Sequence, residues 1–215
     1  MIDIIFLTLK ISVVATLLNI PLALIIGWAV GRKNFRGKFL LELLVSLPLA
    51  LPPVVLGYML LLLIGRSGPI GQISHLLFGS DIVFTWVAAT LAASVVSLPL
   101  MARATIVSMS SVDETLERSA RSLGAGPFRT FLTITIPLSY HGVLGGILIG
   151  FVRALAEFGA TIIVAGNIPG STQTIPLAIY NKVQLGRNDE ALVLVGVSVL
   201  LAICTLSVYT WLLSR

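Results

Sequence analysis

The sequence predicts an all-α integral membrane protein with about five transmembrane helices. Of its 215 residues, 57% are hydrophobic and only 11% are charged, which is less than half the charged fraction of an average soluble domain. The mean hydropathy is +1.04, and long apolar stretches alternate with short polar segments. Because one helical crossing of a bilayer takes about 20 residues, this length accommodates five or six crossings. We therefore expect a single transmembrane domain over residues 1–215, surrounded by the lipid bilayer.

Five apolar stretches are long enough to cross a membrane, and charged residues or Gly and Pro bound each of them. The first is too long for the hydrophobic core of a signal peptide, so we interpret it as a retained span. The longer stretches can cross with tilt. The predicted spans cover residues 4–31, 39–64, 83–109, 138–165 and 190–213.

The Lys and Arg residues of the polar segments are unevenly distributed. The positive-inside rule places the basic segments in the cytoplasm. We therefore expect a multi-pass protein of the cell (inner) membrane, with the N-terminus outside and the C-terminus and segment 110–137 in the cytoplasm. The net charge of +5 is then mainly a topology signal and does not indicate a nucleic-acid partner. The basic residues assigned to the cytoplasmic side are Arg32, Lys33, Arg36, Lys38, Arg118, Arg121, Arg129 and Arg215, and those assigned outside are Arg66, Lys182 and Arg187.

The sequence offers no catalytic, metal or cofactor site of its own. The segment GRKNFRGKF has five residues between its glycines and a Phe after its lysine, whereas a phosphate-binding loop needs four residues and a Ser or Thr. Cys204 has no second cysteine to pair with, and His75 and His141 are isolated. If the chain moves a solute uphill, the energy must therefore come from a gradient or from a partner protein.

A charged segment, TLERSARSLGAGPF at residues 115–128, interrupts the apolar chain. Ser111 and Glu114 have the spacing of a capping box, which predicts a helix that begins near Val112. One narrow apolar stripe follows at helical spacing. It consists of Leu116, Ala120 and Leu123.

The same segment carries signals that end a helix. Gly124 and Gly126 permit the left-handed backbone that stops a helix, and Pro127 suits the first turn of the next one. A helix this short is marginal without packing. Its exposed face would either lie on the lipid headgroups as an amphipathic connector or receive another protein.

The run ERSARSLG, followed by nine residues and then ITIP, resembles the cytoplasmic signature loop of ABC importer permeases. The pattern of that loop is E-A-A, three residues, Gly, nine residues, Ile, one residue, Leu, Pro. Ser119 and Ala120 stand at the alanines and Gly124 at the glycine, while the end of the pattern falls on Ile134, Ile136 and Pro137. Ser119 and Ile136 are substitutions within the pattern.

A further departure concerns the acidic residue, because Arg118 stands in its place and Glu117 precedes it by one residue. The glycine-to-proline spacing, which is the more specific part, is intact. The resemblance implies the type I ABC importer permease fold and a coupling helix around residues 113–125 that docks in a cleft of an ATP-binding subunit. The residues implied in ATPase coupling are Glu117, Arg118, Ser119, Ala120, Leu123 and Gly124.

Three further stretches resemble the molybdate branch of these permeases, in the same order along the chain. They are LPLALPPVVLGY (47–58), GRSGPIG (65–71) and AEFGATIIVAGNIPGSTQTIPLAIY (156–180). The resemblance implies a homodimer that forms the pathway for molybdate, with an external oxyanion-binding protein and two ATPase subunits that bind ATP and magnesium. Permeases for tungstate or sulfate are close relatives and remain alternatives.

Prolines and charges within the spans suggest where the pathway lies. Pro48, Pro52 and Pro53 must break or kink the second span, and broken backbone is tolerated where it faces protein or a water-filled path. They therefore border the translocation path or its gate, unless they only shape packing. Arg153 and Glu157 are four residues apart on the fourth span, which favours a structural charge pair over a substrate contact.

Two other readings of the chain compete with an ATP-driven permease. A gradient-driven transporter or channel would need intramembrane ion-coordinating groups or inverted repeats, and the sequence shows only the one Arg and Glu pair and no convincing repeat. A membrane enzyme is weaker still, for lack of a catalytic constellation.

The turn-rich outer loop 166–176 either receives a docking protein or simply connects two helices.

Overall fold

The computed structural model describes residues 1–213, so Arg215, assigned above to the cytoplasmic side, lies outside the described residues. Within residues 1–213 the chain is helical and has no β-strand, as predicted. The helices are α1 (Ile2–Arg32), α2 (Lys38–Ala50), α3 (Pro53–Ile64), α4 (Pro69–Phe78), α5 (Trp86–Ser110), α6 (Glu114–Ser122), α7 (Pro127–Thr130), the π-helix η1 (Phe131–Thr135), α8 (Ile136–Leu155), α9 (Gly159–Ala165), α10 (Ile175–Gln184) and α11 (Asn188–Leu213).

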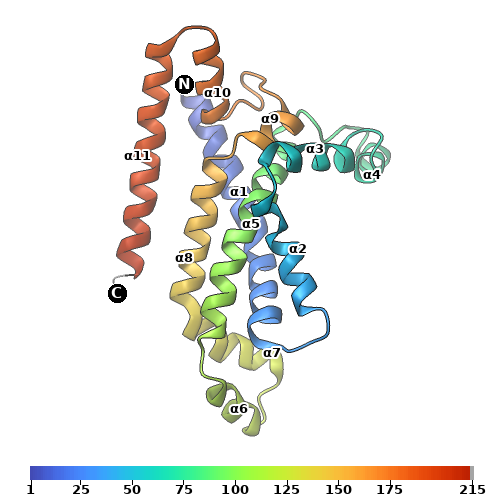
Figure 1. Ribbon diagram of the computed structural model, residues 1–215, viewed down its shortest axis with the longest axis vertical. Helices are drawn as coiled ribbons and strands as arrows, with labels where there is room; N and C mark the ends of the chain where they lie inside the picture. Colours follow the sequence, from blue (N-terminus) through green and yellow to red (C-terminus); the bar gives the residue numbers. More distant parts are fainter. Residues whose placement is uncertain (214–215) are drawn as a thin grey trace.

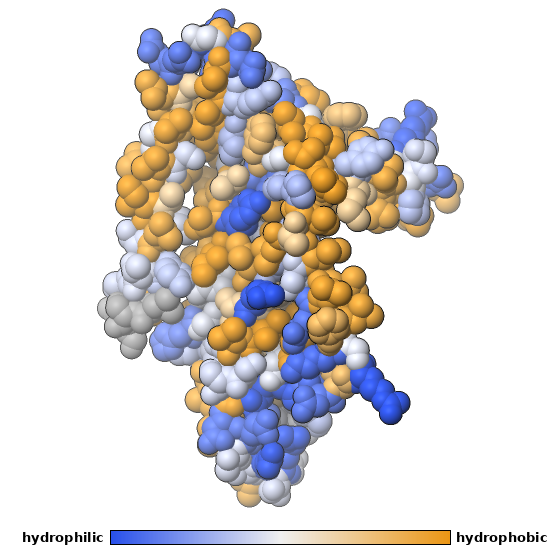
Figure 2. All heavy atoms as spheres, in the orientation of Figure 1, coloured by the Kyte–Doolittle hydropathy of each residue, from blue (hydrophilic) through white to orange (hydrophobic). Residues whose placement is uncertain are grey.

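Long helices form an elongated bundle, with the short helices at its two ends (Figure 1). The N-terminus, α9 and α10 lie at one end, and α6 and α7 lie at the other. Four helical segments are long and apolar enough to cross a membrane, and the bent pair α2 and α3 could supply a fifth crossing. The predicted number of about five spans is thus confirmed. Figure 2 shows a mainly hydrophobic surface along the bundle and hydrophilic side chains gathered at the two ends.

The second predicted span is broken, as its prolines require. The chain bends by 115° between α2 and α3. Pro48 lies inside α2, and the break falls at Leu51 and Pro52, which both have extended backbone. A residue before proline is driven out of the helical region, and two successive prolines remove two backbone N–H donors. The 13 residues of α2 reach only about 20 Å, and α3 runs sideways from the bundle toward α4 (Figure 1).

The packing of α1 against α5 forms the core of the bundle. Most of the buried residues of α5 are small, and they include Ala88, Ala89, Ala92 and Ala93. Small side chains let helix backbones approach closely, which compensates for the lack of a hydrophobic driving force inside a bilayer.

A buried hydrogen-bond network crosses the same interface. The amide nitrogen of Asn19 donates to the carbonyl oxygen of Ser94 and to Oγ of Ser97, each at 3.0 Å. The hydroxyl of Ser94 donates in return to Oδ1 of Asn19 at 2.5 Å. Because the Asn19 side chain is paired through both its nitrogen and its oxygen, the network fixes the register of α1 on α5 without leaving its amide unsatisfied.

The fourth predicted span, 138–165, is not one continuous helix. Helix α8 ends at Leu155, and α9 begins at Gly159 after a short break. Glu157 therefore lies in the break, so the prediction that it shares a helical face with Arg153 is wrong. Its Oε1 accepts the backbone N–H of Ala160 at 2.7 Å. This bond satisfies one of the free N–H groups at the start of α9, which explains why the backbone can restart as a new helix here.

The turn to α3 is held by close packing against α9. A Cβ atom on Gly57 would lie 2.8 Å from both the Cα and the carbonyl oxygen of Ala160. Backbone atoms cannot move aside as the tip of a side chain can, so a methyl group here must separate the two helices.

We expect Gly57→Ala to lower the free energy of unfolding by about 1–3 kcal/mol through this overpacking. Thermal unfolding of the detergent-solubilised protein measures the effect. Gly196→Ala in α11 is the matched control, since a Cβ there meets no atom within 4 Å. Equal melting temperatures for the two variants would contradict the tight contact between α3 and α9.

Candidate functional site

The charged segment forms a short helix, α6, that begins later than predicted. Asp113 is the N-cap, and its Oδ1 accepts the backbone N–H of Thr115 at 2.8 Å. This hydrogen bond holds the pKa of Asp113 below its usual value. The predicted capping box of Ser111 and Glu114 is wrong because Ser111 caps the end of α5 and Val112 is buried. The helix therefore begins only after the chain has passed the buried Val112.

The end of α6 has the predicted glycine turn. Gly124 has a φ of +89°, a backbone conformation that residues other than glycine rarely adopt. Its N–H donates to the carbonyl of Arg121, and the N–H of Ala125 donates to that of Ala120, each at 3.0 Å. These two bonds are the Schellman motif, which satisfies the last carbonyl groups of a helix. Gly124 therefore sets the direction in which the chain leaves α6.

Glu117 points inward, away from the exposed face of α6. Its Oε1 lies 2.9 Å from Nε of Arg32 in α1, and the two side chains are only 11% and 4% exposed. The hydroxyl of Thr135 in η1 donates to the same oxygen at 2.6 Å. Nη1 of Arg32 donates to the carbonyl of Val112 at 2.7 Å. Glu117 thus joins α6 to the end of α1 and to the helix that continues into α8.

This anchor is charged under ordinary conditions. Burial by itself would raise the pKa of Glu117, but the hydrogen bonds from Arg32 and Thr135 and the charge of Arg32 outweigh it and lower the pKa below 4.5. Charge-assisted hydrogen bonds are stronger than neutral ones, and removing one partner of a buried pair leaves the other charge uncompensated. The sequence reading placed Glu117 among the coupling residues but identified neither Arg32 nor Thr135 as its partner, since they are distant in the chain.

The other predicted coupling residues lie on the outer side of α6. Arg118 pairs with Glu114 at 2.8 Å, and both side chains are mostly exposed. Leu123 is 89% exposed and Leu116 is 46% exposed, while Ala120 is partly exposed. Ser119 is also exposed. The predicted apolar stripe is therefore largely uncovered by this chain.

The predicted gate prolines lie far along the chain from this helix, at the bend between α2 and α3. Pro52 is exposed, and Pro53 is partly buried, where its Cβ approaches Gly159 of α9. Pro48 lies within α2 and is also partly buried. The structure thus brings Pro53 next to the start of α9, close in sequence to Glu157, but does not bring the prolines to α6.

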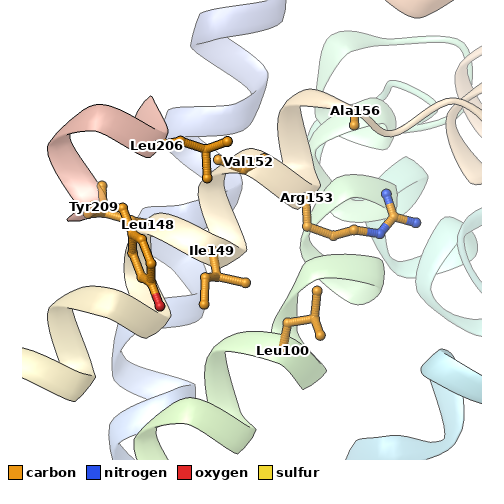
Figure 3. Close-up of a pocket in the computed structure, with 8 residues that line it drawn as sticks. All are labelled: Leu100, Leu148, Ile149, Val152, Arg153, Ala156, Leu206 and Tyr209. Carbon is orange, nitrogen blue, oxygen red and sulfur yellow. The ribbon is translucent and has the colours of Figure 1, made fainter. Parts of the chain in front are cut away.

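The predicted charge pair forms across the end of α8. Nη2 of Arg153 lies 2.9 Å from Oε2 of Glu157, and Glu157 is almost completely buried. Arg153 borders a cavity of about 280 Å³ between α5, α8 and α11, whose other lining residues include Leu206 and Tyr209. Figure 3 shows the guanidinium of Arg153 pointing away from these two residues. Because Glu157 compensates its charge, Arg153 offers little net attraction to an anion.

Sequence reasoning missed another charge within a predicted span, Arg103 in α5. It is exposed at the surface of this chain, and its Nε and Nη2 donate to Oγ of Ser46 in α2 at 3.3 and 3.2 Å. No carboxylate among residues 1–213 lies within 4.0 Å of its guanidinium. A charge within an apolar span was the signal that could have identified it.

Arg103 stands between two hollows on the face formed by α2, α5 and α8. One, of about 170 Å³, includes Glu42 and Ser46 in its lining, and the other, of about 450 Å³, includes Gly142 and Gly146. Figure 2 shows small hydrophilic areas within the hydrophobic band of the bundle. An uncompensated guanidinium is costly in lipid, so this face needs polar surroundings.

Comparison with known proteins decides the family. Residues 20–215 match the family described as binding-protein-dependent transport system inner membrane component.

The chain belongs to this family.

The permease is also similar to individual members. It is 44% identical over 210 residues to the molybdenum transport system permease protein ModB of Haemophilus influenzae, covering 97% of this chain and 92% of that protein. It is 38% identical over 195 residues to the sulfate transport system permease protein CysW of Synechococcus elongatus, covering 88% and 67%. The predicted resemblance to ABC importer permeases is thus confirmed.

The fold is found in solved transporters of the same class. A bacterial ABC transporter involved in the import of the acidic polysaccharide alginate contains a chain that superposes with a TM-score of 0.75 at 17% identity, covering 98% of this permease and 77% of that chain. At this identity the likeness shows the fold alone. It confirms the predicted importer permease fold.

We expect Glu117→Gln to loosen α6 while the spans keep their structure. Loss of the carboxylate leaves the buried Arg32 uncompensated, which costs about 3–5 kcal/mol in comparable pairs. Hydrogen exchange of residues 114–122 should accelerate at least tenfold. Glu114→Gln is the matched control, because its pair with Arg118 is exposed and is worth about 1 kcal/mol at most. Equal exchange in both variants would rule out the anchor.

The same anchor gives α6 a defined pH dependence. Because the folded-state pKa of Glu117 is lowered, its stabilisation is fully present above 4.5, the ordinary value, and is lost as the pH falls through the lower folded-state pKa. Exchange of α6, corrected for the intrinsic rate, should therefore increase only below about pH 4.5. This increase should be absent in Glu117→Gln.

Proposed function

We propose that this chain is the transmembrane permease subunit of an ATP-driven ABC importer and forms the translocation pathway for molybdate delivered by an external binding protein. The similarity to a molybdenum permease along almost the whole chain carries this proposal. In it, residues 1–215 act as one permease domain, with the N-terminus outside and α6 and the C-terminus in the cytoplasm. Helices α9 and α10 and the loop 166–176 then face the binding protein.

The exposed face of α6 supports its role as the coupling helix. Arg118, Ser119, Ala120 and Leu123 would contact the ATPase, because the chain itself leaves this face largely uncovered. Glu117 instead holds the helix to α1 and α8. A push on α6 then moves the spans as a unit. ATP and magnesium are bound by two separate ATPase subunits.

A second copy of the chain would complete the pathway. In this proposal the face of α2, α5 and α8 turns toward the second copy, so that Arg103 faces the route between them and not lipid. An unpaired guanidinium attracts an oxyanion without the compensation that Glu157 gives to Arg153. The bend at Pro52 and Pro53 lets α3 and α9 pack together near the outer end of this route.

Tungstate and sulfate are the alternative cargoes. Both are tetrahedral dianions like molybdate, and a sulfate permease is among the relatives described above. The greater identity and coverage of the molybdenum permease favour molybdate.

The test is uptake by proteoliposomes that contain the permease, its ATPase subunits and its binding protein. We expect ATP-dependent accumulation of molybdate, strong competition by tungstate and weaker competition by sulfate. Uptake driven by an ion gradient without ATPase subunits would overturn the proposal in favour of a secondary transporter. Transport of sulfate alone would retain the importer and change its cargo.

We expect Gly124→Val to reduce ATP-driven uptake by at least tenfold. A β-branched residue is strained at a φ of +89°, so α6 cannot end in its present direction. Uptake per assembled complex in the same proteoliposomes is the measurement. Gly126→Val is the matched control, because Gly126 has a φ of −66° and a Cβ there meets no atom within 4 Å. Normal uptake by Gly124→Val would refute the assigned role of this turn.

We expect Arg103→Gln to reduce molybdate uptake about tenfold or more, as loss of one charged hydrogen bond would. Arg103→Lys should retain part of the activity because it keeps the charge. ATPase binding, measured by co-purification, should be normal in both. Arg66→Gln, which removes an exposed charge outside the spans, should transport normally. Full activity of Arg103→Gln would exclude the residue from the anion route.

A further inference from the structure

A cavity of about 210 Å³ lies between the end of α1, α6 and η1. It is separate from the proposed translocation route and from the exposed face of α6. Three basic side chains line it, and Glu117 is the only carboxylate among its lining residues. The formal charge of the lining is therefore +2. The basic residues are Arg32, Lys33 and Arg121.

Arg32 has a hydrogen-bonding capacity that the chain leaves unused. Its Nε binds Glu117 and its Nη1 binds the carbonyl of Val112. Its Nη2 is buried and has no hydrogen-bond partner among residues 1–213. A buried charged donor without a partner costs a few kcal/mol, and unsatisfied groups of this kind often mark a bound ion or water. Because Arg32 lines the cavity, this unused donor lies on a residue that an anion in the cavity would meet.

The single carboxylate of Glu117 cannot neutralise the basic side chains of this site. Its Nη2 lies 3.9 Å from Oε2 of Glu117, so the carboxylate is shared between Arg121 and Arg32. One negative charge therefore faces two guanidinium groups, and Lys33 adds a third positive charge at the exposed edge. An anion that enters the cavity would reduce this repulsion.

The aromatic residues around the cavity are of the kind enriched at the level of lipid headgroups. Trp28 lies in the last turns of α1, and its ring is 5.5 Å from that of Phe131 in η1. Nζ of Lys33 lies 3.6 Å from the centre of the Trp28 ring. Tryptophan near the end of a span is enriched at the membrane interface, and basic pockets between membrane helices bind anionic headgroups there.

We propose that this cavity binds a phosphate group. Its source is the headgroup of an anionic lipid or free inorganic phosphate, both of which present negative oxygens to a guanidinium. The bound group bridges the end of α1 and α6, so it stiffens the connection through which α6 is held. The site is independent of the cargo and does not require that the chain transports molybdate.

The test uses the complex of the permease with its ATPase subunits in lipid nanodiscs. One set contains phosphatidylcholine alone, a second contains added phosphatidylglycerol, and a third contains phosphatidylcholine with inorganic phosphate in the buffer. Native mass spectrometry of the released complex counts retained lipid, and hydrogen exchange of residues 114–122 reports the stiffness of α6. We expect retained phosphatidylglycerol and slower exchange in the second set. Slower exchange in the third set alone assigns the site to free phosphate.

A matched pair of double variants locates the site. Lys33→Gln with Arg121→Gln removes two charges from the cavity, and Arg36→Gln with Lys38→Gln removes two from the adjoining segment that does not line it. At roughly 1 kcal/mol for each lost contact with the bound phosphate, the first pair should weaken lipid retention about thirtyfold. The second pair should retain lipid as the wild type does.

Two results would overturn the proposal. The first is that neither lipid nor phosphate changes the hydrogen exchange of α6 in the wild-type complex, a comparison that does not depend on whether a variant folds. The second is that the cavity variant loses its ATPase subunits while its lipid retention is unchanged, which would assign these basic residues to protein docking.

Discussion

The buried contact between Arg32 and Glu117 is the constraint on which the end of the bundle that carries α6 depends. Helix α6 is too short to be stable alone, and its outer face has almost no contact with the chain. Its position is therefore set by one carboxylate that meets α1 through Arg32 and η1 through Thr135. Because Arg32 belongs to α1 and Thr135 leads into α8, the proposed coupling would transmit a displacement of α6 to both spans at once.

That transmission requires spans that move as a unit, and the packing of α1 on α5 provides this. Alanines bring the two backbones together, and the paired amide of Asn19 fixes their register. At the other end of the bundle the helices are interrupted: α8 stops, Glu157 caps α9, and the chain bends between α2 and α3. The long helices are thus continuous toward α6 and broken near α9.

Electrostatics separates the two arginines within the spans. Arg153 shares its charge with Glu157, so it is compatible with an apolar neighbourhood. Among residues 1–213, the guanidinium of Arg103 has only the hydroxyl of Ser46 as a hydrogen-bond partner, and this group carries no charge. The difference explains why the proposed route follows Arg103: a neutral pair stabilises structure, whereas an unpaired cation in a span is tolerated only beside water, a partner or an anion.

The sequence by itself determined the helical membrane class, the approximate spans, the proline break and the glycine end of α6, because each follows from local composition or from the φ angles that Pro and Gly permit. The spacing of its signature loop also determined the family resemblance. Only the tertiary structure decided that Asp113 rather than Ser111 starts α6, that Glu117 faces inward, and that Glu157 caps a separate helix. The reason is that these depend on partners distant in the chain, such as Arg32, which lies 85 residues before Glu117, and no local pattern specifies which buried charges will meet.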